Sequence, residues 1–240
     1  MISRQDELER LGAFPFAHRG LHGPGRIENS RAAFEAAILA GSGIEFDVQA
    51  SRDGEIFVFH DEGLERVTAQ EGPLASRTAA DLSSIRLEGS DETIPTLAET
   101  LRLVCGRAPL LIELKSPGRR VDLLCRAAAA ALKGYEGPAG IMSFNPEIGR
   151  WFGSHAPGRL RGLVVTGQDK GKLRGRLERG LGLWRSRADF LACDIRDLPS
   201  AFAARARSRG KPIFTWTVRT DAERIRAAAY ADQIIYEGAA

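Results

Sequence analysis

Short apolar runs alternate with amphipathic segments along most of the chain, which predicts strands that take turns with helices. The expected parallel strands are 14–17, 44–47, 110–114, 139–144, 160–165, 189–193, 213–218 and 233–236. The expected helices between them are 30–39, 121–133, 146–152, 172–184, 199–209 and 221–230. About eight parallel strands with intervening helices predict a closed (β/α)8 TIM barrel, and a doubly wound open sheet is the alternative.

A short link interrupts this alternation after the second strand. Residues 51–54 join that strand to another apolar run at 56–59, and a link this short requires an antiparallel β-hairpin. A two-residue turn would set His60 opposite Glu45 or Asp47, depending on which residues form the turn. Either register places the imidazole on the face of both carboxylates, whereas a three-residue loop would reverse that parity.

The connection 62–109 is far longer than an ordinary βα loop. We expect it to form a small insertion that sits as a lid at the barrel mouth, within one domain spanning residues 1–240. The composition agrees with a packed domain, because 43% of the residues are hydrophobic and 27% are charged.

Composition also excludes several classes of protein. The net charge of +3 is too small to indicate a nucleic-acid partner. No apolar run has the length of a membrane span, so we expect no stable membrane insertion. Residues 1–7 are charged and lack the apolar stretch of a signal peptide, which predicts a cytoplasmic location. Three isolated cysteines are expected to be buried free thiols, namely Cys105, Cys125 and Cys193.

The segment 170–187 carries seven basic residues. Its large apolar residues, Leu173, Leu177, Leu181 and Trp184, recur at helical spacing. This pattern is typical of an outer barrel helix with a solvated face. Binding to a membrane surface is the alternative.

The candidate chemistry begins with two carboxylates. Glu45 and Asp47 are two residues apart in a strand, so their side chains point to the same face. Like charges this close repel each other unless a cation neutralises them, and a divalent metal with oxygen ligands is the simplest solution. Glu113 can complete such a site from the next barrel strand. Lys115 and Arg19 would supply positive charge for an anionic substrate, although Lys115 could instead form a structural ion pair with Glu113.

Two histidines stand at strand ends, where barrel enzymes keep their reactive groups. His18 ends the first strand and His60 ends the hairpin, although each could be an ordinary turn residue. Trp216, in the seventh strand, is either an apolar wall of the pocket or a core residue.

Eight short motifs carry these residues. In chain order they are His18-Arg19-Gly20, Glu28-Asn29, Glu45-x-Asp47, Asp53-Gly54, His60-Asp61, Glu113-x-Lys115, Ser143-Phe144-Asn145 and Trp216-Thr217-Val218. Their order resembles that of the glycerophosphodiester phosphodiesterase family, from about residue 16 to residue 236. The resemblance implies a β/α barrel with an insertion after the His-Asp motif. It also implies hydrolysis of small-molecule glycerophosphodiesters to sn-glycerol 3-phosphate and an alcohol.

On the matching positions, the resemblance implies that Glu45, Asp47 and Glu113 hold one divalent cation, Mg²⁺ or Ca²⁺. It implies that His18 and His60 act as general base and general acid.

The resemblance further implies that Arg19 and Lys115 bind the substrate phosphate. One departure is the end of the last strand, where the family often has a Thr-Asp-x-Pro-like segment. This chain has Ile235-Tyr236-Glu237-Gly238 instead. Two alternatives remain: a related phosphodiesterase acting on lysophospholipids or cyclic phosphates, and a catalytically silent barrel that binds a ligand. The intact histidine pair speaks against the silent barrel, because binding alone needs no acid–base partners.

Overall fold

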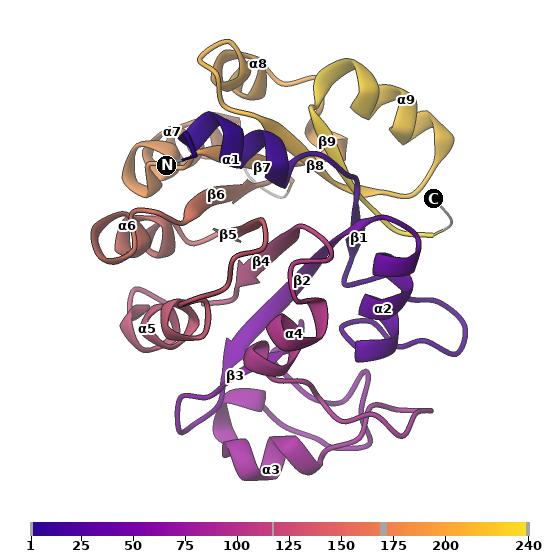
Figure 1. The fold of residues 1–240 in the computed structure, drawn as a ribbon. Helices are drawn as coiled ribbons and strands as arrows, with labels where there is room; N and C mark the ends of the chain where they lie inside the picture. The colour runs from indigo at the N-terminus through magenta and orange to yellow at the C-terminus, as the bar shows by residue number, and fades with distance from the viewer. Residues whose placement is uncertain (1, 117, 169–171, 239–240) are drawn as a thin grey trace.

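Eight parallel strands close on themselves in the computed structural model, which describes residues 2–116, 118–168 and 172–238. The parallel strands are β1 (Phe16–His18), β2 (Gly43–Ala50), β4 (Leu110–Leu114), β5 (Ala139–Ser143), β6 (Leu160–Val165), β7 (Phe190–Asp194), β8 (Ile213–Val218) and β9 (Gln233–Tyr236). Each pairs with its neighbour, and β1 pairs with both β2 and β9 (Figure 1). The predicted TIM barrel is therefore confirmed, and the open sheet is excluded.

Helices surround this barrel, as Figure 1 shows. They are α2 (Arg31–Leu39), α4 (Leu97–Val104), α5 (Asp122–Ala131), α6 (Pro146–His155), α7 (Lys172–Ser186), α8 (Ala201–Arg207) and α9 (Asp221–Tyr230). Side-chain caps start several of them at the predicted places; Ser30, for example, accepts a hydrogen bond from the backbone N–H of Ala33. Helix α4 contacts both α2 and α5. The long connection 62–109 thus contains the second barrel helix.

The hairpin after β2 has a register that differs from both predicted ones. Strand β3 (Ile56–Val58) pairs antiparallel with β2, with Val48 opposite Val58. The backbone N–H of Ser51 donates to the carbonyl of Glu55 at 2.8 Å, which leaves a three-residue loop at 52–54. The prediction of a two-residue turn was therefore wrong.

The parity of the hairpin is reversed as a result. Phe59, not His60, lies opposite Asp47, whose carbonyl accepts its backbone N–H at 2.9 Å. His60 nevertheless lines the pocket at the carboxyl ends of the barrel strands, two residues beyond Val58, the last residue of β3.

The first part of the long connection, residues 62–96, packs beside the hairpin. It contains η1 (Leu74–Ser76) and α3 (Ala79–Ser84). Its apolar side chains join two from the hairpin in a separate small core made of Phe57, Phe59, Leu64, Leu74, Leu82, Ile85, Leu87 and Ile94. This core lies apart from the barrel interior and gives the connection its own hydrophobic support.

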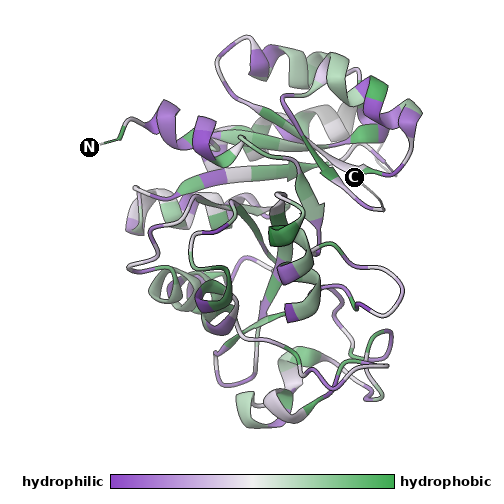
Figure 2. Cartoon of the chain, turned by 45° about the vertical axis from the view of Figure 1, so that its right-hand side comes forward, coloured by the Kyte–Doolittle hydropathy of each residue, from purple (hydrophilic) through white to green (hydrophobic). Residues whose placement is uncertain are grey.

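A helix that the sequence pattern did not predict precedes the barrel. Helix α1 (Arg4–Leu11) is mostly polar, and Figure 2 shows it largely in purple, whereas the barrel strands are largely green. Leu8 and Leu11 are buried and pack in the barrel interior with Phe190 and Phe214. Two apolar positions are too few to show a helical period in sequence.

Two further expectations can be compared with the structure. Cys125 and Cys193 are buried free thiols as expected, but Cys105 is exposed, because it caps the end of α4 in a left-handed conformation. In the described ranges, no helix is both long enough and apolar enough to cross a bilayer.

Candidate active site

A pocket of about 320 Å³ opens where the barrel strands end. The side chains that line it come from the carboxyl ends of the strands and the residues just after them. They are His18, Arg19, Glu45, Asp47, His60, Glu113, Lys115, Met142, Phe144, Val164, Asp194, Ile195, Arg196, Trp216, Thr217, Arg219, Glu223 and Ile235. All eight residues that the sequence singled out are among them, whereas residues 62–109 contribute none.

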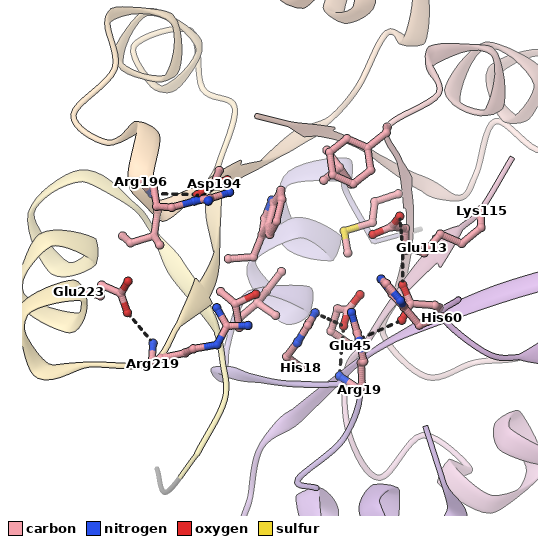
Figure 3. Close-up of a pocket in the computed structure, with 18 residues that line it drawn as sticks. His18, Arg19, Glu45, His60, Glu113, Lys115, Asp194, Arg196, Arg219 and Glu223 are labelled. Carbon is pink, nitrogen blue, oxygen red and sulfur yellow. Dashed lines mark hydrogen bonds and ion pairs between the residues drawn. The ribbon is translucent and has the colours of Figure 1, made fainter. Parts of the chain in front are cut away.

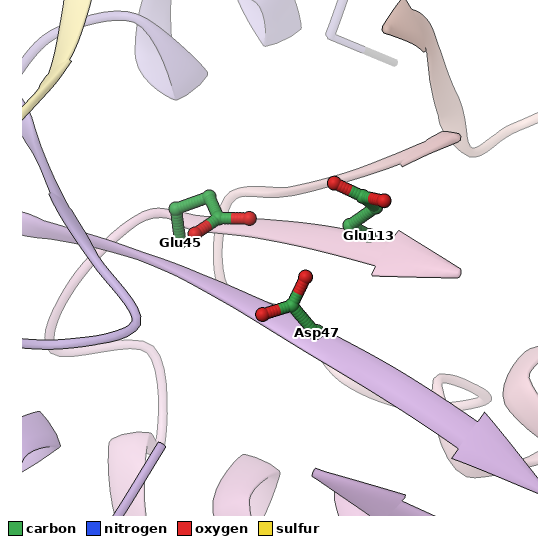
Figure 4. A group of neighbouring side chains, drawn as sticks. All are labelled: Glu45, Asp47 and Glu113. Atoms are coloured by element: carbon green, nitrogen blue, oxygen red, sulfur yellow. The ribbon is translucent and has the colours of Figure 1, made fainter. Parts of the chain in front are cut away.

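Three buried carboxylates lie together on one side of this pocket. Glu45 and Asp47 come from β2, and Glu113 comes from β4, where it pairs directly with Asp47 (Figure 4). One oxygen from each lies within 4.8 Å of the others. Their convergence agrees with the predicted all-oxygen cation site.

The positively charged side chains beside this triad balance only part of the negative charge of its three carboxylates. Burial, followed by Asp47 and Glu113, raises the pKa of Glu45 well above its usual range. Burial and the Asp47 charge raise the pKa of Glu113 to about 7. Burial also acts to raise the pKa of Asp47, but Lys115 and neighbouring cations outweigh it, so this pKa is lowered. Two carboxyls that resist ionisation beside a third that stays ionised fit a site for a hard divalent cation.

Lys115 is the nearest cation to the triad. Its Nζ lies 3.0 Å from Asp47 Oδ1 and 2.9 Å from Glu113 Oε1. The ion pair with Glu113 that was considered as an alternative thus exists, but it is shared with Asp47 at the pocket surface. Lys115 therefore lines the pocket as well as pairing with the carboxylates.

Arg19 is held against the triad by an unusual backbone. It follows β1 with φ of 56°, in the left-handed region that non-glycine residues rarely adopt. Its backbone N–H donates to Glu45 Oε2 at 3.2 Å, and its Nε lies 3.4 Å from Asp47 Oδ2. A third link, from its guanidinium to Glu28 at 2.8 Å, fixes the side chain. Gly20 follows at φ of 79°, where a Cβ would meet Ala33 at 2.9 Å.

His18 is held between two carboxylates. Its Nδ1 lies 2.5 Å from Glu237 Oε1, and its Nε2 lies 3.8 Å from Glu45 Oε2. Because a carboxylate accepts, the Nδ1–H is the donor, and the neutral ring then presents the Nε2 lone pair to the pocket. Burial lowers the pKa of His18, which favours this neutral form.

Glu237 is the functional neighbour that sequence reasoning did not assign. Burial opposes its ionisation, but the hydrogen bonds from His18 and Arg219 outweigh burial and lower its pKa to about 2. The Arg219 bond measures 2.6 Å. The sequence held one signal for this residue, namely its place directly after the last barrel strand.

His60 lines the same pocket from the end of the hairpin. Its Nδ1 lies 2.6 Å from Asp61 Oδ1, and 30% of its side chain is exposed. Asp61 also accepts a hydrogen bond from Arg66, which in turn donates to Glu28. The long connection thus contacts the rim of the pocket through Arg66.

The opposite wall of the pocket contains aromatic side chains and two acid–base pairs. Trp216 packs edge-to-face on Phe144, with ring centroids 5.6 Å apart, and donates from Nε1 to the carbonyl of Ala192 at 2.9 Å. Trp216 both lines the pocket and packs on the interior core.

Four charged residues complete that wall, and sequence reasoning missed them. Asp194 ends β7 and Arg196 follows it, whereas Arg219 follows β8 and Glu223 lies in the first turn of α9. Arg196 donates to Asp194 at 2.6 Å, and the backbone N–H of Arg219 donates to Glu223 at 2.8 Å. Figure 3 shows these pairs across the pocket from His18 and the carboxylates. Their positions after predicted strands were the available signal, but they form no spaced motif.

The comparison with known families decides the assignment. Residues 18–237 match the model of the glycerophosphoryl diester phosphodiesterase family. The chain belongs to this family. A glycerophosphodiester phosphodiesterase from Bacillus altitudinis is 40% identical over 107 residues, covering 42% of this chain and 43% of that protein. A human protein named lysophospholipase D is 27% identical over 127 residues, covering 48% and 40%. The matched region thus spans about half or less of the length of these relatives.

Solved structures of family proteins share the fold. A phosphodiesterase from Oleispira antarctica, in complex with the product sn-glycerol-3-phosphate, superposes with a TM-score of 0.79 at 22% identity, covering 94% of this chain and 93% of that one. A glycerophosphodiester phosphodiesterase from Thermotoga maritima gives a TM-score of 0.71 at 25% identity, with 92% of each chain covered. This chain therefore has the same barrel fold as these solved proteins.

Proposed function

We propose that this chain hydrolyses glycerophosphodiesters to sn-glycerol 3-phosphate and an alcohol. The observation that carries the proposal is the placement of two imidazoles and a buried carboxylate triad around one pocket of a family member. Phosphodiester cleavage needs a proton acceptor, a proton donor and charge neutralisation, and this pocket contains groups for all three.

The triad of Glu45, Asp47 and Glu113 would hold one divalent cation, Mg²⁺ or Ca²⁺. The fit rests on three buried oxygen ligands within 4.8 Å of one another, two of which have raised pKa values. When bound, such a cation neutralises phosphate oxygens and lowers the pKa of a coordinated hydroxyl or water.

The two histidines would move the protons. His18 Nε2 accepts the proton of the attacking hydroxyl as that oxygen bonds to phosphorus. The attacking group is water or the glycerol hydroxyl of the substrate; in the second case the first product is a cyclic phosphate, which a water molecule then opens to sn-glycerol 3-phosphate. Glu237 accepts the Nδ1–H of His18 and stabilises the imidazolium that forms. His60 donates a proton to the leaving alkoxide as the P–O bond to the alcohol breaks. Asp61 orients the His60 ring through the hydrogen bond at Nδ1.

The remaining predicted residues would bind substrate. Arg19 and Lys115 place positive charge beside the triad, where the phosphate must lie for either imidazole to reach its oxygens. Trp216 offers an apolar face to the glycerol or to the alcohol group.

A coupled assay for released glycerol 3-phosphate tests the proposal. We expect release from glycerophosphocholine and other head groups, complete loss of turnover in excess EDTA, and recovery on addition of Mg²⁺ or Ca²⁺. Full activity in EDTA would contradict the cation assignment.

A choline-release assay separates the alternatives, because both glycerophosphocholine and lysophosphatidylcholine give choline when the diester is hydrolysed, whereas the lysolipid gives lysophosphatidate in place of glycerol 3-phosphate. Lysophosphatidylcholine is the comparator, because the human relative's name indicates a lysophospholipase D. Preference for that lipid, or for a cyclic phosphate, would assign this chain to a related phosphodiesterase activity. Binding of glycerophosphocholine without turnover would favour a silent barrel.

A further inference from the structure

The apolar stripe of helix α7 faces solvent. Leu177, Leu181 and Trp184 lie at positions i, i+4 and i+7, and they are 68%, 64% and 74% exposed. The outer helix expected from the sequence is present, but on this face the solvated residues are the large apolar ones. Three such side chains in one row are unusual on a surface helix and indicate a binding surface.

Small residues on the inner face of α7 explain this orientation. Gly182 and Ser186 are buried, and a Cβ on Gly182 would lie 3.4 Å from Leu163. The helix therefore rests closely on the barrel through small residues. At 100° per residue, the stripe falls on the opposite side from these contacts.

A groove of about 840 Å³ adjoins the stripe, between α7 and α8. Trp184, Leu183 and Phe202 form its apolar part. Five cations also line it, namely Arg179, Arg187, Arg205, Arg209 and Lys211. No acidic residue occurs among the described residues of the groove's lining, so the charged side chains that line the groove are all positive, whereas Glu178 lies on α7 beside Leu177.

We infer that the stripe and the groove, which we call the α7–α8 surface, dock on an anionic phospholipid bilayer. Tryptophan and leucine side chains can enter the interfacial layer, while arginine heads stay at the level of the lipid phosphates. The binding is peripheral, since no described helix can cross a membrane.

Charge complementarity favours this occupant over others. A symmetric dimer through the same patch would bring Arg205 and Arg209 of one copy towards the same residues of the other. A nucleic acid would satisfy the cations and could stack a base on Trp184, but it would leave the aliphatic side chains of Leu177 and Leu181 without a partner. An anionic bilayer can contact both the apolar side chains and the cations of this surface.

The surface is separate from the catalytic pocket. Among the described residues, none lines both the groove and the pocket. Variants of the α7–α8 surface should therefore leave hydrolysis of a soluble diester unchanged, which keeps this inference independent of the proposed function.

Sedimentation with vesicles tests the inference. We expect the wild-type protein to pellet with vesicles of phosphatidylglycerol and phosphatidylcholine in equal parts, but not with phosphatidylcholine alone, and to be released as salt rises. The double variant Leu181→Ser with Trp184→Ser should stay in the supernatant. A matched control, Leu39→Ser with Ile225→Ser, removes two exposed apolar side chains elsewhere (85% and 74% exposed) and should still pellet.

The charge arm uses a second pair of variants. Arg205→Glu with Arg209→Glu should weaken binding to the anionic vesicles by at least about tenfold. Arg102→Glu with Arg226→Glu makes the same change in net charge on α4 and α9 and should weaken it much less. Circular dichroism and melting curves confirm that each variant is folded.

Several results would overturn the inference. They are equal binding to neutral vesicles, no binding to either kind, and equal losses in the control variants. Light scattering that shows a dimer abolished by Leu181→Ser with Trp184→Ser would assign the surface to a second copy of the chain instead.

Discussion

The two halves of the pocket differ in how they hold charge. On the side of β1, β2 and β4, the carboxylates are almost fully buried, with Glu45 2%, Asp47 1% and Glu113 7% exposed. On the side of β7 and β8, the side chains of Arg196 and Arg219 are 61% and 56% exposed. Buried charges interact strongly and are fixed by their partners, whereas solvated charges interact weakly. We therefore expect the buried half to carry the reaction and the exposed half to influence the preference for a head group.

Removing either imidazole should have the largest effect and is the strongest test of the difference between the two halves. We expect His18→Ala and His60→Ala each to lower kcat by at least about 10²-fold, because each removes a positioned proton-transfer group. Steady-state release of glycerol 3-phosphate measures the loss. His155→Ala, on the outer helix α6, serves as the control. Near-full activity in either pocket variant would remove that histidine from the mechanism.

Glu237 joins the two halves, because it accepts hydrogen bonds from His18 and Arg219. Glu237→Gln keeps an acceptor for the imidazole but loses the charge that stabilises the imidazolium. We expect kcat to fall by about tenfold or more while KM changes little. Glu223→Gln, which alters a carboxyl bonded to the Arg219 backbone, should leave kcat nearly unchanged. Equal effects of the two variants on kcat would mean that Glu237 only holds Arg219 in place and does not assist His18.

The residues of the buried half could be predicted from the sequence, because each pair lies at a fixed spacing within a single strand or directly after its end. Glu45 and Asp47 share a strand face, and Glu113 and Lys115 do the same. Glu237 could not be linked to His18 in this way. The two are 219 residues apart, and only the closure of β9 onto β1 brings them together.

The fold shows the same division. Alternation of apolar runs predicted the strands and most helices, but the parity of the hairpin depended on a loop of three residues. There the Ser51 hydroxyl accepts the N–H of Glu55 at 2.9 Å, a local hydrogen bond that hydrophobic patterning does not encode. In α7 the period of the leucines was correct, but a period does not say which face meets the barrel, and the buried Gly182 decided it.

The exposed half should give smaller effects. Arg196→Ala removes a cation that is 61% exposed, although its partner Asp194 is buried, and screening by solvent on the cation's side limits the loss to roughly 1 kcal/mol. We therefore expect KM to change by at most about fivefold, to differ among head groups, and kcat to stay constant. Kinetics on glycerophosphocholine and glycerophosphoglycerol check this. A loss of kcat as large as that of the histidine variants would contradict the division of roles.

The smallest effect expected is in the pH dependence of stability without a bound cation. The pKa of Glu113 is raised from 4.5 to about 7, mainly by burial, so the folded protein binds this proton more tightly than the unfolded chain. The free energy of unfolding therefore decreases as pH rises from about 4.5 to about 7. Glu113→Gln removes this titration. In EDTA, the variant should melt at a similar temperature to wild type at pH 5 and a few degrees higher at pH 8.

Asp194 at the end of β7 supplies the opposite case, because this carboxylate is also buried (1% exposed) but is paired with a solvated cation. Burial acts to raise its pKa, but hydrogen bonds, above all those from Arg196, outweigh it and lower the pKa below 3.8. Its stabilising contribution is therefore complete above that pH and is lost only in stronger acid. Asp194→Asn should lower the melting temperature equally at pH 5 and pH 8. If Glu113→Gln also shifted it equally at both values, the buried triad would carry no excess of negative charge, and the reason to place a cation there would disappear.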